Sequence, residues 1–287
     1  MALGLVLTLA ASHGVARADI LDQAYAAGSE AAAAGDWEAA IEHWTEAAEY
    51  LPGRSAQLDY DLGTAHAQLG ELGPATYYFE RALQPEARPS SELAKLARRN
   101  LSVVRRQAEV EAEVEGRQVA WREGWWNLVV EILAGQAVAW VALVSAWLVV
   151  LGVGGRWWLR RRDGGASTPR ARTLGAASIA FAVLAALGGI LHGLAYDAVH
   201  GTPEAITLEA GTQLRERPGA HLPLAFAVQG GSRVRVLEER SGWVRLRLPS
   251  GLEGWTRRES VARLDQPWVR TPVRAEADAE TPPAGSR

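Results

Sequence analysis

The sequence predicts a multi-domain membrane protein with an all-α solenoid, a two-helix transmembrane hairpin and a small all-β barrel. Three observations lead to this prediction: two long apolar runs in the middle of the chain, a repeated helical pattern before them, and short alternating strands after them. The formal net charge of −3 gives no basis for nucleic-acid binding. The chain has no cysteine, which excludes disulfides, thiolate metal sites and thiol catalysis.

Two apolar runs, residues 132–155 and 173–196, contain no Asp, Glu, Lys or Arg. Each has roughly 24 residues and would form a helix of about 36 Å, which exceeds the ~30 Å hydrocarbon core of a bilayer. A core helix of a soluble protein keeps a polar stripe, and these runs have none. We therefore predict two transmembrane helices. Their polar residues, Gln136 and His192, are expected to form interhelical hydrogen bonds or to reach the interface.

The loop between the runs, residues 156–172, determines the predicted orientation. It carries six arginines and one acid, Asp163, and a short loop of this kind stays in the cytoplasm. Both soluble parts then lie on the opposite side of the membrane. Tryptophans flank the first helix, as expected at membrane–water interfaces: Trp125, Trp126, Trp157 and Trp158.

Residues 1–18 have the pattern of a signal peptide. A short apolar run is followed by Ala16-Arg17-Ala18, which predicts cleavage between Ala18 and Asp19. The segment before the apolar run has no Lys or Arg, so retention as a membrane anchor is the alternative. Cleavage would export the following segment, in agreement with the orientation that the arginine loop predicts.

Residues 19–107 contain a helical pattern that repeats after 35 positions, so that Gly28 and Trp44 recur as Gly63 and Phe79. The clearest copy is residues 35–52, GDWEAAIEHWTEAAEYLP. The pattern resembles the tetratricopeptide repeat, and the resemblance implies an all-α solenoid whose helices pack through small and aromatic residues. The packing positions are Gly28, Ala40, Trp44, Ala47, Gly63, Ala75, Phe79 and Ala82.

Two further helical segments follow the repeats. Residues 92–106 are expected to form a capping helix, the first of an incomplete third repeat. Its apolar face would consist of Leu93, Leu96, Leu101 and Val104. Residues 108–131 are expected to form a helical connector with Val110 and Val114 on one face. A strand also fits the alternation of acids and valines in residues 108–121, but Ala and Glu favour a helix.

The resemblance to tetratricopeptide repeats implies a protein-binding groove on the concave face formed by the first helices. By position, that face would consist of Tyr25, Ser29, Tyr60, Asp61, Thr64, Gln68, Lys95 and Arg98. The alternative is that these residues form only a solvated surface. His43 and His66 have no partner at metal-ligand spacing, so we expect no metal site.

Residues 205–264 change character to short strands separated by Gly, Ser and Pro turns. Valines and leucines alternate with arginines between residues 233 and 248, which predicts an antiparallel meander with an arginine-lined outer face. The strand order and the Gly251-x-x-Gly254-Trp255 motif resemble a bacterial SH3-like domain, which implies a small all-β barrel. Residues 265–287 are expected to form a disordered tail.

Trp243 and Trp255 are the two tryptophans of this module, and each is either a core residue or a contact residue. We assign both to a ligand face of the SH3-like domain. The chain contains no nucleophile–base set, paired carboxylates or phosphate-binding loop that we recognise. We therefore expect a binding protein that is not an enzyme and has no cofactor.

The complete order of export signal, repeats, membrane hairpin and SH3-like domain resembles the BatE-like proteins of the Bat aerotolerance operon. The resemblance implies a periplasm-facing scaffold in the bacterial inner membrane. Its partners would be von Willebrand factor A-type membrane proteins and a MoxR-type ATPase. One alternative is a cell-wall sensor or anchor whose SH3-like domain binds peptidoglycan. Another is a subunit of a secretion or cytochrome-assembly machine.

Overall fold

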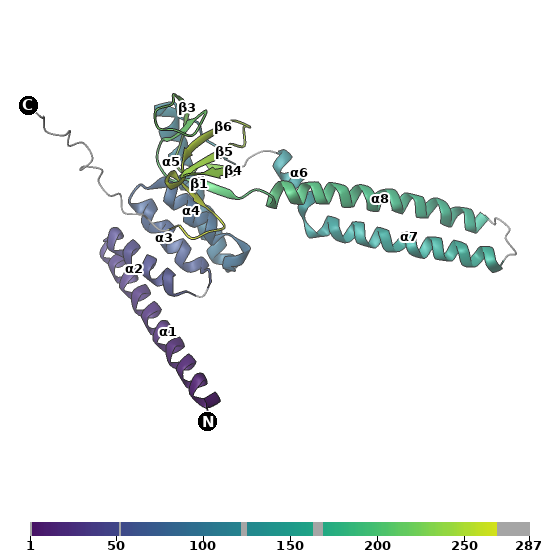
Figure 1. Cartoon of the computed structure of the whole chain (residues 1–287), viewed down its shortest axis with the longest axis horizontal. Coiled ribbons are helices and arrows are strands. Elements are labelled where there is room, and N and C mark those ends of the chain that lie inside the picture. Colours follow the sequence, from purple (N-terminus) through teal and green to yellow (C-terminus); the bar gives the residue numbers. More distant parts are fainter. Residues whose placement is uncertain (1, 52, 122–124, 163–168, 269–287) are drawn as a thin grey trace, which may run out of the picture. The chain divides into compact units, whose positions relative to one another are not determined.

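The computed structural model describes residues 2–51, 53–121, 125–162 and 169–268. Its contacts divide the chain into two compact units. We call them the helical unit, within Met1–Val110 and Ala262–Arg287, and the membrane–sheet unit, Glu111–Val261. Each is described separately, and Figure 1 labels their elements.

The helical unit begins with two helical hairpins. The first pairs α1 (Ala2–Ala34) with α2 (Trp37–Tyr50), and the second pairs α3 (Ala56–Gln68) with α4 (Leu72–Ala82) (Figure 1). Gly35 and Gly70 make the turns with φ of +80° and +75°, a conformation that favours glycine. The side chains of Asp36 and Ser55 cap α2 and α3 by accepting hydrogen bonds from Ala39 and Leu58. The predicted signal cleavage site, between Ala18 and Asp19, lies within α1.

The two hairpins have the same internal packing. Trp44 lies against Gly28 in the first hairpin, and Phe79 lies against Gly63 in the second. Tyr25 and Tyr60 extend each contact, with ring centroids 6.4 Å from Trp44 and 5.8 Å from Phe79 respectively. All eight positions predicted to pack the repeats are buried. The 35-residue sequence repeat therefore corresponds to a repeated three-dimensional contact.

The third helical segment differs from the prediction. After a short 3₁₀ turn, η1 (Pro85–Ala87), helix α5 runs over Ser91–Glu115. Of the predicted apolar face, Leu101 and Val104 are buried, but Leu96 is 47% exposed. Val110 and Val114 are 58% and 81% exposed, so the face that they share is not packed. Alanines complete the packed face because they allow close helix contact: the buried set is Ala94, Ala97, Leu101, Val104, Ala108 and Ala112.

The connector is also different, because its helix ends at Glu115 and Gly116 follows with φ of +64°. The next residues are extended and hydrogen-bonded to the β-sheet. Gln118 donates to the carbonyl of Ala227 (2.9 Å), and its own carbonyl accepts from Gln229 (2.9 Å). A wholly helical connector over 108–131 is therefore wrong, because residues 117–120 find backbone partners at the sheet.

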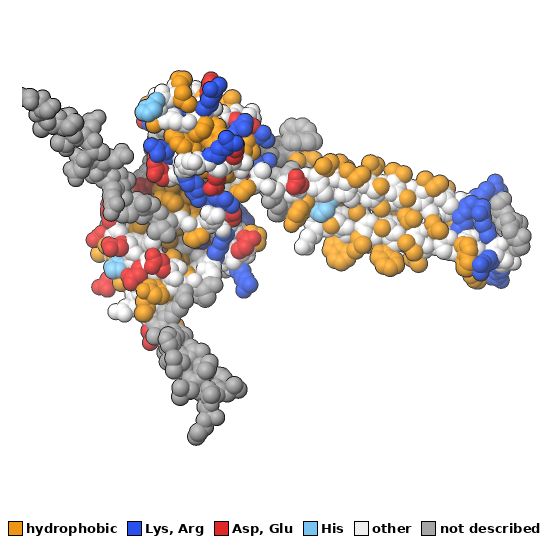
Figure 2. Space-filling view, in the orientation of Figure 1, with side chains coloured by type: hydrophobic (Ala, Val, Ile, Leu, Met, Phe, Trp, Pro, Cys, Tyr) orange, Lys and Arg blue, Asp and Glu red, His pale blue; other side chains and the backbone are white. Residues whose placement is uncertain are grey.

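Two helices are long and apolar enough to cross a membrane: α7 (Gln136–Arg162) and the part of α8 (Pro169–His200) from Arg172 to Asp197. Most of their large apolar side chains are exposed, as lipid-facing residues would be. Figure 2 shows hydrophobic side chains along this hairpin and arginines gathered at the end where α7 and α8 join.

The helix boundaries differ in detail from those predicted. The run 132–155 is divided at Gly135, because α6 (Trp125–Ala134) ends there and α7 begins at Gln136. Helix α7 also continues through Arg162, so the first arginines of the predicted loop are helical. His192 forms the expected interhelical hydrogen bond, with Nδ1 2.9 Å from the carbonyl of Leu133 in α6.

The carboxy-terminal module is a seven-stranded sheet, and the strands described in pairs are antiparallel, as predicted. Its strand order is β3-β2-β6-β5-β4-β1-β7, and a 3₁₀ turn, η2 (Arg258–Ser260), precedes β7. Alternate residues, including Val234, Val236, Val244 and Leu246, fill the core, and arginines lie between them. The strands are β1 (Glu204–Thr207), β2 (Thr212–Arg215), β3 (Leu224–Val228), β4 (Arg233–Arg240), β5 (Trp243–Arg247), β6 (Glu253–Arg257) and β7 (Val261–Arg263).

Candidate functional site

The residues predicted to line a protein-binding groove mostly bind one another or their own helices. The hydroxyl of Tyr25 donates to Asp61 at 2.6 Å, and Gln57 donates to the same carboxylate at 3.0 and 3.1 Å. Burial raises the pKa of Asp61, while the hydrogen bond from Tyr25 opposes that rise. Burial and the contact with Asp61 raise the pKa of Tyr25. This pair therefore connects α1 to α3.

The other predicted groove residues either bond within the helical unit or are exposed to solvent. Ser29 and Thr64 donate to backbone carbonyls one turn earlier in their own helices, and Tyr60 accepts from Asn100 at 3.1 Å. Lys95 forms an exposed ion pair with Glu92, and the side chains of Gln68 and Arg98 are exposed. The structure does not provide an empty polar groove at these residues.

A different surface of the helical unit binds a short peptide main chain, which turns at residues 264–266, where the N–H of Gln266 lies 3.4 Å from the carbonyl of Arg263. The peptide is residues 264–268 of the same chain, directly after β7, and we call it the docked segment. Its alternate carbonyls all accept hydrogen bonds. Arg54 donates to the carbonyl of Leu264 (2.9 Å), Tyr77 to that of Gln266 (2.7 Å) and Tyr78 to that of Trp268 (3.3 Å).

The Tyr77 hydroxyl is the centre of this contact. It donates to the Gln266 carbonyl and accepts from the backbone N–H of Trp268 at 2.9 Å and from Arg81 Nη1 at 2.8 Å. The one donor and both acceptor positions of the hydroxyl are therefore used, two by the docked segment and one by Arg81. The tyrosine is fully buried, so these bonds form away from bulk water.

Aromatic rings surround the indole of Trp268. Its centroid lies 6.0 Å from Tyr77 in an edge-to-face arrangement, 6.1 Å from Tyr78 and 6.1 Å from His66. His66 stacks on Tyr78 at 5.3 Å, and its Nδ1 lies 2.6 Å from a carboxylate oxygen of Glu71. The three rings form a pocket around the indole.

A buried ion pair supports the pocket. Arg81 Nε lies 3.4 Å from Asp59 Oδ1, and both residues are buried. Burial raises the pKa of Asp59 to about 6, although the positive charges of Arg81 and Arg54 oppose this rise. Burial likewise raises the pKa of Tyr77, against the opposing effect of Arg81.

The docked segment corrects one boundary of the sequence prediction. We expected a disordered tail from Asp265, but residues 265–268 are held against α4 by the contacts just described. Residues 269–287 lie outside the described residues. The sequence signal was a tryptophan directly after proline in an otherwise polar tail, together with the adjacent Tyr77 and Tyr78 of α4.

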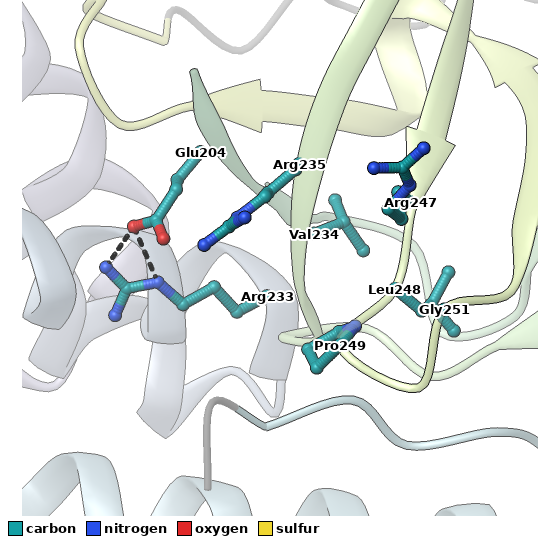
Figure 3. A pocket seen from close by; sticks show the side chains of 8 residues that line it. All are labelled: Glu204, Arg233, Val234, Arg235, Arg247, Leu248, Pro249 and Gly251. Atoms are coloured by element: carbon teal, nitrogen blue, oxygen red, sulfur yellow. Dashed lines mark hydrogen bonds and ion pairs between the residues drawn. The ribbon is translucent and has the colours of Figure 1, made fainter. Parts of the chain in front are cut away.

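The β-sheet carries a second feature, a pocket with a cavity volume of about 160 Å³ between β1, β4 and β5 (Figure 3). A cross-strand row passes along it, in which Glu204 lies opposite Arg235, Arg235 opposite Arg247, and Arg247 opposite Glu253. Arg233 pairs with Glu204, as the dashed lines of Figure 3 show. Arg247 pairs with Glu253 at 2.6 Å. Within the described part of the chain, Arg235 has no ion pair.

The two tryptophans assigned to a ligand face have different environments. Trp255 is 7% exposed and therefore belongs to the interior, which corrects its assignment as a ligand contact. Trp243 is half-buried, with the guanidinium of Arg257 5.1 Å from its ring centroid. Trp243 alone keeps an accessible aromatic surface on β5.

Over the described ranges, no group of three His, Asp or Glu side chains is arranged to hold a metal ion. Comparison with known proteins adds no identification. No protein-family model matches the chain. A search of curated proteins likewise gives no significant match.

Proposed function

We propose that this chain is a non-enzymatic scaffold of the bacterial inner membrane that binds other proteins through its helical unit. The observation that carries the proposal is the docked segment. Its main chain is bound at alternate carbonyls, and its tryptophan enters a pocket of aromatic rings. A surface with these two properties is suited to binding peptides, because main-chain hydrogen bonds provide affinity and a side-chain pocket provides specificity.

Membrane anchoring follows from α7 and the apolar part of α8, which are long and apolar enough to span a bilayer. In the proposed orientation the arginine-rich end of the hairpin is cytoplasmic, and both soluble modules are periplasmic. Reporter fusions after Gln107 and after Leu264 test this orientation. Both should be active as alkaline phosphatase, and a fluorescent cytoplasmic fusion at either position would overturn it.

The repeated Gly28–Trp44 and Gly63–Phe79 contacts support a tetratricopeptide-like array. Together with the membrane hairpin and the SH3-like module, they support membership in the BatE-like class. The proposed partners are accordingly a von Willebrand factor A-type membrane protein and, through it, a MoxR-type ATPase.

Purification in mild detergent from the native membrane tests these partners. Wild type should retain the von Willebrand factor A-type protein. A chain with Arg54→Gln and Tyr78→Phe, which lacks two of the carbonyl donors, should lose it. Tyr25→Phe is the matched control, because that hydroxyl binds Asp61 and not the docked segment. Absence of both proposed partners from the wild-type eluate would contradict the proposal.

Arg235, which has no ion pair among the described residues and lies opposite Arg247, favours the second candidate, a cell-wall sensor or anchor. An anionic wall polymer such as peptidoglycan would supply a negative charge to pair with Arg235. Sedimentation with purified peptidoglycan distinguishes the two. The wall-binding function predicts that wild type co-sediments and Arg235→Gln does not, while the scaffold function predicts no co-sedimentation.

A further inference from the structure

We propose that the docked segment is a resident ligand of the helical unit, and that a partner binds by displacing it with a segment carrying its own tryptophan. This inference rests on the proposed protein-binding function and specifies its ligand. The inference starts from the observation that most side chains of the docked segment are exposed to solvent.

The helical unit contacts the docked segment through its backbone and its tryptophan. Trp268 lies in the ring pocket, whereas the side chains of Asp265, Gln266 and Pro267 are exposed. The three bonded carbonyls are present in any peptide. The surface therefore selects for a tryptophan that follows a main chain able to present these carbonyls.

Pro267 is compatible with the bound form of the docked segment. A proline disfavours helical backbone in the residue before it, so the turn at residues 264–266 does not continue as a helix. The missing N–H of Pro267 is not needed, because the helical unit uses the carbonyl of Gln266 and the N–H of Trp268.

The covalent link makes the docked segment an effective competitor. Because the docked segment belongs to the same chain, its encounter with the helical unit does not depend on protein concentration, whereas a free peptide must compete at its own concentration. A free peptide then meets mostly occupied surface, and its apparent affinity decreases in proportion to the unoccupied fraction. Removing the resident indole should therefore raise the affinity for the same peptide in trans.

The test uses the full-length chain in mild detergent and a fluorescent synthetic peptide of residues 262–268 with an amidated carboxyl end. Fluorescence anisotropy measures its dissociation constant. Trp268→Ala should bind the peptide at least about tenfold more tightly than wild type. Trp268→Phe, which keeps an aromatic ring at this position, should remain close to wild type. A peptide in which the tryptophan is replaced by alanine should not bind.

A second pair of variants tests whether the peptide occupies the assigned surface. Adding Tyr78→Phe to Trp268→Ala removes one hydroxyl donor and should weaken peptide binding about two- to tenfold. Adding Tyr25→Phe should leave it unchanged, because this tyrosine binds elsewhere. Circular dichroism of each variant shows whether its helices are retained.

Three results would overturn the inference. They are equal affinity of wild type and Trp268→Ala, absence of binding to both, and a wild-type dimer that Trp268→Ala converts to monomer. The last result would show that the segment is exchanged between copies. These results differ from failure of the scaffold proposal. In that case the peptide would bind as expected, but neither proposed partner would co-purify with wild type.

Discussion

The indole of Trp44 covers Gly28 so closely that a Cβ at residue 28 would lie 2.5 Å from the ring. Such a separation is not tolerated, and both groups lie in packed helices. We predict that Gly28→Ala lowers the free energy of unfolding of the helical unit by about 1–3 kcal/mol through overpacking. This loss appears despite the gain of up to about 1 kcal/mol that alanine gives in a helix.

The corresponding position of the second hairpin gives the comparison. A Cβ at Gly63 would lie 2.9 Å from Phe79, so Gly63→Ala should be less harmful than Gly28→Ala. Combining Gly28→Ala with Trp44→Phe should recover part of the loss, because the smaller ring leaves room for the methyl group. Urea denaturation of the full-length protein, followed by circular dichroism, measures these differences. Additive effects of the two substitutions would contradict the contact.

The buried carboxyl of Asp59 predicts a pH dependence with a definite sign. Its pKa is raised to about 6 in the folded chain, above the value of about 4 expected when unfolded. Between these values the folded state keeps a proton that the unfolded state releases. The free energy of unfolding therefore decreases as pH rises through this window, by up to ~1.4 kcal/mol per pH unit from this group.

Asp59→Asn isolates this contribution, because asparagine does not titrate. The difference in unfolding free energy between wild type and variant should change across the window and become constant above about pH 6. Denaturant titrations at several pH values measure it. The buried Asp61, whose pKa is also raised, stays in both proteins and cancels in the difference. A constant difference at all pH values would disprove the assignment.

Arg235 predicts a stabilising substitution in the sheet. It lies directly opposite Arg247, and like charges opposite each other in an antiparallel pair are unfavourable. Arg235→Thr should raise the free energy of unfolding of the sheet by about 0.2–1 kcal/mol, with a smaller gain at high salt. Thermal denaturation in low and high salt is the measurement.

Arg245→Thr is the matched control, because Arg245 already pairs with Glu253 at 2.6 Å. It should not increase stability. If Arg235→Thr destabilises the sheet as much as the control does, then repulsion between Arg235 and Arg247 is absent.

The sequence predicted the features that depend on local periodicity. Gly28 and Trp44 recur 35 residues later as Gly63 and Phe79, which indicated two hairpins of the same kind. In each hairpin the glycine and the aromatic residue meet across the helix pair. The uncharged runs indicated two helices long and apolar enough to cross a membrane, and alternating valine and arginine indicated a sheet. In each case neighbouring residues in the sequence carry the information.

The errors concern contacts between distant segments. The tryptophan after Pro267 marks the tail as unusual, but no local pattern shows that Trp268 meets Tyr77 and Tyr78, about 190 residues earlier, or the still earlier His66. The helix of the connector ends at Glu115, before Gly116, because residues 117–120 find partners on the sheet. Likewise, most of the packed face of α5 consists of alanines, which a search for large apolar residues does not detect.

The membrane hairpin permits a direct test of helix register. A Cβ at Gly188 in α8 would lie 3.5 Å from the Cβ of Ala142 in α7, within the range that disulfides require. The natural chain has no cysteine, so an introduced pair has no competing thiol. Ala142→Cys with Gly188→Cys should therefore form a disulfide in native membranes on mild oxidation.

A protease site inserted within residues 163–168 makes the bond visible, because the two cleaved halves stay joined on a non-reducing gel. Ala142→Cys with Gly189→Cys is the control, since a Cβ at Gly189 has no neighbour within 4 Å among the described residues. Adding Gly152→Leu should reduce the yield of the first pair, because a Cβ at residue 152 would collide with the Ser178 hydroxyl. Equal cross-linking of both pairs would show that α7 and α8 meet in another register.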